Sequence, residues 1–203
     1  MGRKGWAGSP PADDVEARKR IVDAAVRSVE HRGPAATSVA DVAADLGITR
    51  KTVYRYFSGT EELFMAVSEV ALDRWIAQLE AATGWIEDPG DLLVETVANI
   101  VETIPRDPLL SLLLATGHTA VFSEQMLARE SIALARAILL ARKVDWPALG
   151  LDDAALDELV EHLIRVTHSM IVTPPDPPRT GEELRAYLRR WAVPIWRLGP
   201  PGT

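Results

Sequence analysis

The chain has 203 residues, of which 47% are hydrophobic and 25% are charged, and it contains no cysteine. This composition is that of a globular protein with a sizeable core, and the lack of thiols excludes disulfides, thiolate zinc sites and cysteine nucleophiles. The formal net charge of -7 is unevenly divided, because residues 1–60 hold 10 Lys and Arg against 7 Asp and Glu, whereas residues 61–203 hold 12 against 22. A basic front on an acidic body indicates that one module binds a polyanion and that the other has a different task.

Residues 1–12 are expected to form a flexible tail. They include basic residues but lack the apolar run of a secretory signal, and no apolar segment of the sequence is long enough to span a bilayer. We therefore expect a cytoplasmic protein without a membrane partner.

Apolar residues recur with helical spacing almost throughout, and no stretch shows sustained strand-like alternation, which predicts an all-α fold. The first helix is expected from about Asp13 to His31, and Gly33-Pro34 stops it. A short second helix follows Ser38, which precedes Asp41 by the three residues of a capping box.

A tight turn at Gly47 is expected to join the second helix to the third, because glycine readily adopts the positive φ of a helix C-cap. Thr49 is placed to cap the third helix, Arg50 to Tyr56, and Ser58 or Thr60 to cap a fourth that runs to about Ala82. Beyond Gly84, prolines and glycines separate further helices, expected near Asp91–Ile104, Pro108–Thr116, Ser123–Lys143, Asp152–Val172 and Gly181–Arg197.

Two short helices joined by a glycine turn form a helix-turn-helix, in which the second helix enters the major groove of DNA. Ile48, Val53 and Phe57 supply the apolar positions that hold this helix on its neighbour. The rest of its surface carries donors suited to phosphates and base edges: Arg50, Lys51, Thr52, Tyr54, Arg55 and Tyr56. The alternative is a solvated basic helix with packed aromatic rings, and the glycine turn within the basic part of the chain favours DNA binding.

The run TSVADVAADLGITRKTVYRYFSGTEELF resembles the N-terminal domain of the TetR family of bacterial transcriptional regulators, over roughly residues 14–74. The resemblance implies a three-helix DNA-binding head with a linking fourth helix. It also implies a helical body that binds a small molecule and forms a homodimer, and an operator that is nearly palindromic.

Carried over by position, the resemblance assigns DNA contacts to four groups of residues. Arg50, Lys51 and Thr52, at the start of the third helix, match the residues that read bases. Tyr54 and Tyr56 match the aromatic residues that contact phosphates, and Thr37 or Ser38 matches a contact from the start of the second helix. Arg55 falls at a variable position that also reaches DNA. Thr60 stands where many members have lysine, so the charge of one phosphate contact is absent.

The acidic body shows no motif of catalysis or metal binding, and we expect no enzyme activity, cofactor or metal. The ligand cavity that the resemblance implies is expected to take a hydrophobic or cationic effector, because the body is apolar and acidic. Its candidate contacts are flat or adaptable apolar side chains and one imidazole: Trp75, Trp85, His118, Phe122, Met126 and Met170. The alternative for each is an ordinary place in the core.

The last two predicted helices carry apolar stripes wider than a single neighbour needs. By the resemblance such a helix pair forms the dimer interface, and burial in the core of one chain is the alternative. The candidate interface residues are Leu156, Leu163, Met170, Leu184, Leu188 and Trp191.

These features together predict the tail over residues 1–12, a DNA-binding domain over 13–60, and an effector-binding and dimerisation domain over 61–203. The expected function is that of a ligand-responsive transcriptional regulator, a repressor rather than an activator, which binds double-stranded DNA as a homodimer. The alternatives are an effector-binding dimer that has lost operator binding and an all-α enzyme.

Overall fold

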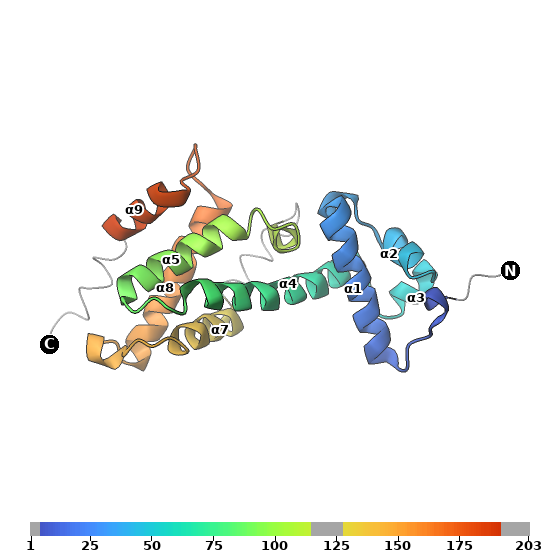
Figure 1. Cartoon of the computed structure of the whole chain (residues 1–203), viewed down its shortest axis with the longest axis horizontal. Coiled ribbons are helices and arrows are strands. Elements are labelled where there is room, and N and C mark those ends of the chain that lie inside the picture. Colours follow the sequence, from blue (N-terminus) through green and yellow to red (C-terminus); the bar gives the residue numbers. More distant parts are fainter. Residues whose placement is uncertain (1–4, 115–127, 192–203) are drawn as a thin grey trace. The chain divides into compact units, whose positions relative to one another are not determined.

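The computed structural model describes residues 5–114 and 128–191, and every regular element within them is a helix (Figure 1). The all-α prediction is confirmed for this part of the chain. The chain divides into two compact units, and of the described residues the first contains 5–74 and 107–113, while the second contains 75–106, 114 and 128–191. The division falls at residues 74–75, inside the fourth helix, whereas the sequence placed the domain boundary at residues 60–61.

The first unit contains α1 (Asp14–Arg32), α2 (Val39–Asp45), α3 (Arg50–Tyr54) and the beginning of α4 (Thr60–Thr83). Short 3-10 turns occur at Trp6–Gly8, Pro34–Ala36 and Leu110–Leu114. Helix α1 packs against α2, and α2 packs against α3. The order and placement of these four helices follow the sequence prediction closely.

Local chemistry fixes the turn between α2 and α3. Ser38 and Asp41 form the predicted capping box, in which each side chain accepts a hydrogen bond from the backbone N–H of the other residue. Gly47 has a φ of 64°, in the left-handed region that favours a residue without Cβ. Thr49 caps α3 by accepting a hydrogen bond from the N–H of Thr52 at 3.1 Å. The predicted helix-turn-helix is therefore present.

Helix α3 is shorter than predicted, since it ends at Tyr54 and not at Tyr56. The N–H groups of Tyr56 and Phe57 both donate to the carbonyl of Val53, so the helix closes on a shared acceptor instead of continuing. This closure turns Phe57 inward, where its side chain is 1% exposed beside a fully buried Val53 on the preceding turn. Two of the three apolar positions predicted to hold α3 are therefore buried, and Ile48 is partly buried.

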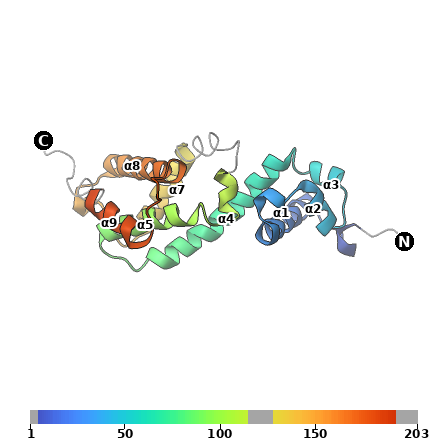
Figure 2. The same cartoon turned by 90° about the horizontal axis from the view of Figure 1, so that it is seen from above.

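The second unit contains the end of α4 together with α5 (Pro89–Thr103), α7 (Arg129–Leu140), a 3-10 turn at Pro147–Leu149, α8 (Asp153–Val172) and α9 (Gly181–Trp191). Helix α5 packs against both α8 and α9, and α7 packs against α8 (Figure 2). The core between them is aliphatic with one tryptophan, and its largest members include Leu92, Leu139, Trp146, Leu156, Leu163, Leu184 and Leu188.

Three of the helices predicted beyond Gly84 also differ from the structure in their extent. The one expected over Pro108–Thr116 is the 3-10 turn Leu110–Leu114, because the Asp107 side chain accepts the N–H groups of Leu109 and Leu110 and fixes a turn; residues 115 and 116 lie outside the described residues.

The helix expected over Ser123–Lys143 is α7, which ends at Leu140, and residues 123–127 lie outside the described residues. Its end follows from the carbonyl of Leu139, which accepts the N–H of Arg142 and the indole N–H of Trp146. The last helix is described to Trp191, and residues 192–197 of that prediction also lie outside. None of the helices in the described part combines the length and apolarity that a membrane span requires.

Candidate DNA-binding surface and ligand pocket

The outer surface of α3 presents the side chains that the sequence assigned to DNA. Arg50, Lys51 and Tyr54 are exposed, and Tyr54 is 50% exposed. Thr52 is partly buried, and its hydroxyl lies 2.9 Å from that of Thr49. The burial of Val53 and Phe57 fixes the orientation of the helix, so its cations point to solvent.

Two cations of the first unit differ from the other described cations of this unit, because they form no ion pair with a described residue. The unit contains nine described Lys and Arg residues. Seven of them pair with a carboxylate: Arg18, Lys19, Arg20, Arg27, Arg32, Arg55 and Arg74. The remaining two are Arg50 and Lys51, which have no ion pair with a described residue. The unneutralised positive charge therefore lies at the start of α3.

Arg55 and Tyr56 are engaged with a carboxylate on α1. The Arg55 guanidinium donates to Oδ1 of Asp14 at 2.9 Å, and the Tyr56 hydroxyl donates to the same oxygen at 2.8 Å. Arg55 also donates to the Tyr56 hydroxyl, and its guanidinium lies 4.6 Å from the centroid of the Tyr56 ring. Burial, and then the hydrogen bond to Asp14, raises the pKa of Tyr56, so this phenol stays protonated as a donor.

The two candidates before α2 differ in what their hydroxyls contact. Thr37 is 7% exposed, shares a hydrogen bond with Ser28 at 3.0 Å and donates to the carbonyl of Gly33 at 3.0 Å. Its hydroxyl therefore serves the packing of the first unit. Ser38 is exposed at the start of α2, and its hydroxyl belongs to the capping box with Asp41. The structure thus favours Ser38 over Thr37 as a surface contact.

The predicted ligand contacts do not gather in one place. Trp75 is 7% exposed, and its indole N–H donates to Oδ1 of Asn99 at 2.9 Å, so it is a core residue with a satisfied polar group. Trp85 is 76% exposed, and it lines no described cavity. Met170 is partly buried and lines a pocket. His118, Phe122 and Met126 lie outside the described residues.

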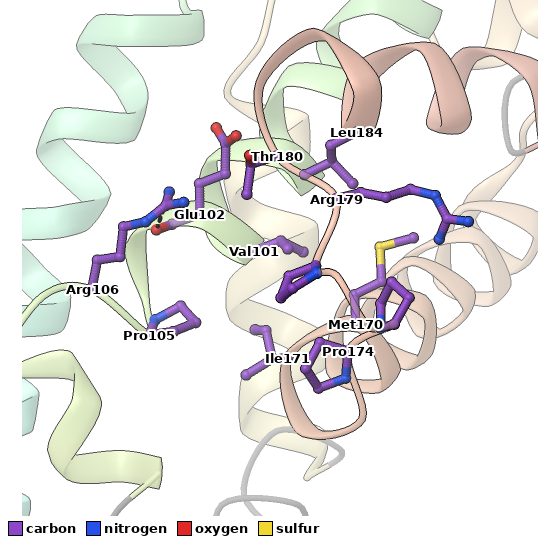
Figure 3. Close-up of a pocket in the computed structure, with 12 residues that line it drawn as sticks. Val101, Glu102, Pro105, Arg106, Met170, Ile171, Pro174, Arg179, Thr180 and Leu184 are labelled. Carbon is purple, nitrogen blue, oxygen red and sulfur yellow. Dashed lines mark hydrogen bonds between the residues drawn. The ribbon is translucent and has the colours of Figure 1, made fainter.

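A pocket of about 260 Å³ opens between the ends of α5 and α8 and the segment that leads into α9 (Figure 3). Most of its lining is apolar, from Val101, Pro105, Met170, Ile171, Pro174, Pro175, Pro178 and Leu184. The carboxylate of Glu102 is already occupied, since one oxygen accepts the N–H of Gly181 at 2.6 Å and the other accepts Arg185 at 3.2 Å.

Two guanidinium groups supply the remaining charge of this pocket. Arg106 donates to a backbone carbonyl at 3.2 Å and has no ion pair with a described residue. Arg179 lies 4.5 Å from the centroid of the Tyr187 ring, and its contact with Glu183 is long, at 3.9 Å. The pocket is therefore apolar with positive charge at its edge.

Most of the predicted dimer residues belong to the core of a single chain. Leu156, Leu163, Leu184 and Leu188 are at most 8% exposed, and all four lie within the cluster that joins α5, α7, α8 and α9. Within the single chain these four leucines pack against neighbouring helices, which is the core alternative that the sequence left open. Trp191 differs, with a side chain that is 61% exposed, and Met170 is partly buried at the pocket.

Sequence reasoning missed two features of these sites. Asp14 is 41 residues from Arg55 along the chain, and no local pattern connects them. The prolines between α8 and α9 were interpreted only as separators of two helices, but three of them line the pocket. The run Pro174-Pro175-Asp176-Pro177-Pro178, followed directly by Arg179, was the available signal.

The comparisons with known proteins agree with the geometry of the first unit. Residues 21–67, which include α2 and α3, match the model of the family described as bacterial regulatory proteins, tetR family. An uncharacterized HTH-type transcriptional regulator of Mycobacterium tuberculosis, Rv1255c, is 26% identical over 180 residues, which cover 88% of this chain and 85% of that one. The HTH-type transcriptional regulator BetI of Brucella anthropi is 30% identical over 81 residues, 40% of this chain and 42% of that one.

Solved structures share the fold along nearly the whole chain. The structure of RolR in complex with resorcinol has a TM-score of 0.62 at 19% identity and covers 94% of this chain and 98% of that one. The TetR family repressor AlkX from a Dietzia strain has a TM-score of 0.57 at 19% identity, and the match covers 93% of this chain and 99% of that one. With the helix-turn-helix in place and its recognition helix exposed, residues 21–67 form a DNA-binding domain of the tetR family of bacterial regulatory proteins, and the chain is a DNA-binding transcriptional regulator.

Proposed function

We propose that this regulator binds its operator as a homodimer through α3 in the major groove, and that it represses transcription until a small molecule enters the second unit. The observation that carries the DNA-binding face is the absence of carboxylate partners for Arg50 and Lys51 among the described residues, while the other described cations of the first unit are paired. An unpaired cation at an exposed position is free to contact phosphates or guanine edges without losing an internal ion pair.

The roles of the individual contacts follow from their chemistry. Arg50 and Lys51, with Thr52, are proposed to read base edges, and Tyr54 to bond a phosphate through its exposed hydroxyl. Ser38 is proposed to add a backbone contact from the start of α2. An all-α enzyme is the weaker alternative, because the family is one of regulators and the described site offers DNA donors instead of a catalytic cluster.

The test is DNA binding by the purified protein to the region upstream of its own gene. Arg50→Ala and Lys51→Ala should each weaken specific binding by about 1–3 kcal/mol if the side chain reads a base. Lys19→Ala is the matched control, since Lys19 is also exposed but pairs with Asp23 on α1. Equal binding by the wild type and an Arg50→Ala/Lys51→Ala double variant over a range of salt concentrations would refute the proposed face.

We infer that the pocket beside Met170 is a site for the effector. Among the relatives in fold, RolR was solved with resorcinol and EbrR with imidazole, both small ring compounds. The apolar lining suits a ring or short chain, and the arginines at the edge favour a neutral or anionic effector over the cationic one that the acidic composition suggested.

Filling the pocket tests this assignment. Met170→Trp should abolish release of DNA by an effector found in a metabolite panel, while DNA binding itself is retained. Leu149→Trp places the same ring at an exposed position outside the pocket and is the control. Unchanged release by Met170→Trp would show that the effector binds elsewhere.

The homodimer is proposed to form through exposed parts of α8 and α9, with Trp191 at the contact. A tryptophan that is 61% exposed on an amphipathic terminal helix is surface that a partner would bury. Trp191→Glu should then shift the molar mass measured by light scattering from that of two chains toward that of one. No shift would place the contact elsewhere. A protein that binds DNA in this way is proposed to act in the cytoplasm.

A further inference from the structure

We propose that Asp14 occupies the place of a DNA phosphate, and that it competes with DNA for the donors of Arg55 and Tyr56. This inference rests on the proposed role of α3 in DNA binding. The Asp14 carboxylate sits on the first turn of α1, and a single one of its oxygens accepts both donors, from Arg55 at 2.9 Å and from Tyr56 at 2.8 Å. An anionic oxygen that joins a guanidinium and a hydroxyl is the arrangement that a phosphate oxygen would adopt with the same pair.

A purely structural role does not account for this contact. The capping position of α1 is already filled by Asp13, whose side chain accepts the N–H of Glu16 at 2.8 Å. The ion pair joins side chains that are 65% and 80% exposed, and ion pairs between exposed side chains contribute little to stability. The main effect of Asp14 is therefore that it occupies the donors of Arg55 and Tyr56, which are then less available to DNA.

The contact of Asp14 with Arg55 and Tyr56 lowers the binding free energy that DNA phosphates obtain from these two donors. While Asp14 holds Arg55 and Tyr56, a phosphate must displace the carboxylate, and the displaced negative charge then lies beside the phosphate. Both effects lower affinity for any DNA sequence, because phosphate contacts carry no sequence information. Binding then depends more heavily on Arg50 and Lys51, which have no such competitor among the described residues.

The test compares Asp14→Asn with the wild type on operator and on random duplex DNA across a salt series. The asparagine keeps the size of the side chain and removes its charge. Affinity for both duplexes should rise about fivefold at low salt, which is the value of one net hydrogen bond. The slope of log K against log salt should steepen by about 0.9, as expected for one more neutralised phosphate. Melting curves of the two proteins check that the fold is kept.

Two further variants separate this mechanism from a general effect of charge. Asp23→Asn removes the same charge from α1, but Asp23 pairs only with Lys19 of that helix among the described residues, so its affinity and slope should stay near those of the wild type. Combining Asp14→Asn with Arg55→Gln should return the slope to that of Arg55→Gln alone. An unchanged slope for Asp14→Asn, or an equal gain for Asp23→Asn, would overturn the inference while operator binding stands. Absence of salt-dependent binding by the wild type would overturn the proposed function and this inference together.

Discussion

Replacing Arg185 by glutamine is expected to loosen α9 from α5. The Arg185 Nε donates to both oxygens of Glu95, at 3.0 and 2.8 Å, and its Nη1 donates to Glu102 at 3.2 Å and to the carbonyl of Gly181 at 3.1 Å. Burial by itself would lower the pKa of Arg185, but the hydrogen bonds and charges of Glu95 and Glu102 outweigh it and raise the pKa. The guanidinium is therefore a fixed cation between two carboxylates of α5.

The size of the effect follows from this geometry. The Arg185 side chain is 22% exposed and its two carboxylate partners are 27% and 19% exposed, so solvent screens the three charges only partly. A hydrogen bond to a charged group is worth about 1.5–3 kcal/mol, and the loss of one partner leaves the others desolvated. Arg189 remains 3.8 Å from Glu95 and offsets part of the loss. We expect about 2 kcal/mol, roughly a thirtyfold change in the opening equilibrium of α9.

Hydrogen exchange measures this opening directly. Amides of the peptide that covers α9 should exchange about thirtyfold faster in Arg185→Gln. Arg190→Gln is the control, because Arg190 is exposed on the same helix and has no ion pair with a described residue. Adding Glu95→Gln to Arg185→Gln should restore part of the protection, since it removes a largely buried carboxylate that has lost its two hydrogen bonds from Arg185. Equal exchange in Arg185→Gln and Arg190→Gln would refute the view that these ion pairs hold α9.

Three further outcomes are expected in the first unit. Gly47→Ala should cost about 1 kcal/mol in urea unfolding because of the positive φ at this turn, while Gly47→Asn should cost less, and equal costs would contradict the backbone explanation. The hydrogen bond from the Ser38 hydroxyl lowers the pKa of Asp41, and the Ser38 N–H and Arg32 contribute further. The ionised Asp41 therefore stabilises the fold above the ordinary Asp pKa, and this stabilisation is lost as the pH falls through the lowered pKa. The urea midpoint of Asp41→Asn should thus lie below that of the wild type at neutral pH and approach it in acid. Lys51→Glu should abolish DNA binding while leaving the urea midpoint equal or higher, and a lower midpoint would mean that Lys51 serves the fold.

The helices and their caps could be predicted because their causes are local. Ser38, Thr49 and Gly47 act within a few residues of their own positions, and the structure places each of them as expected. The helix-turn-helix pattern and its cations indicated that α3 binds DNA, and the family resemblance then assigned roles to its individual residues.

What a buried face packs against could not be predicted in the same way. The spacing of Leu156 and Leu188 indicates that each is buried, but it does not distinguish the core of one chain from a partner, and the structure assigns both to the core. The pocket and the contact of Asp14 with Arg55 depend on segments distant in sequence. Periodicity carries no information about such pairs.

The charge at the start of α3 is best explained by a partner outside the chain. Each of the seven other described α-helices has an acidic residue in its first turn, where a negative charge interacts favourably with the free N–H groups of the helix. In α3 the first turn has no acidic residue and carries Arg50 and Lys51 in its place. Folding alone disfavours two adjacent cations at this position, and neither gains a carboxylate from the described part of the chain to offset that cost. A bound polyanion would supply the missing negative charge, so the local disadvantage to the helix becomes favourable once DNA phosphates face it.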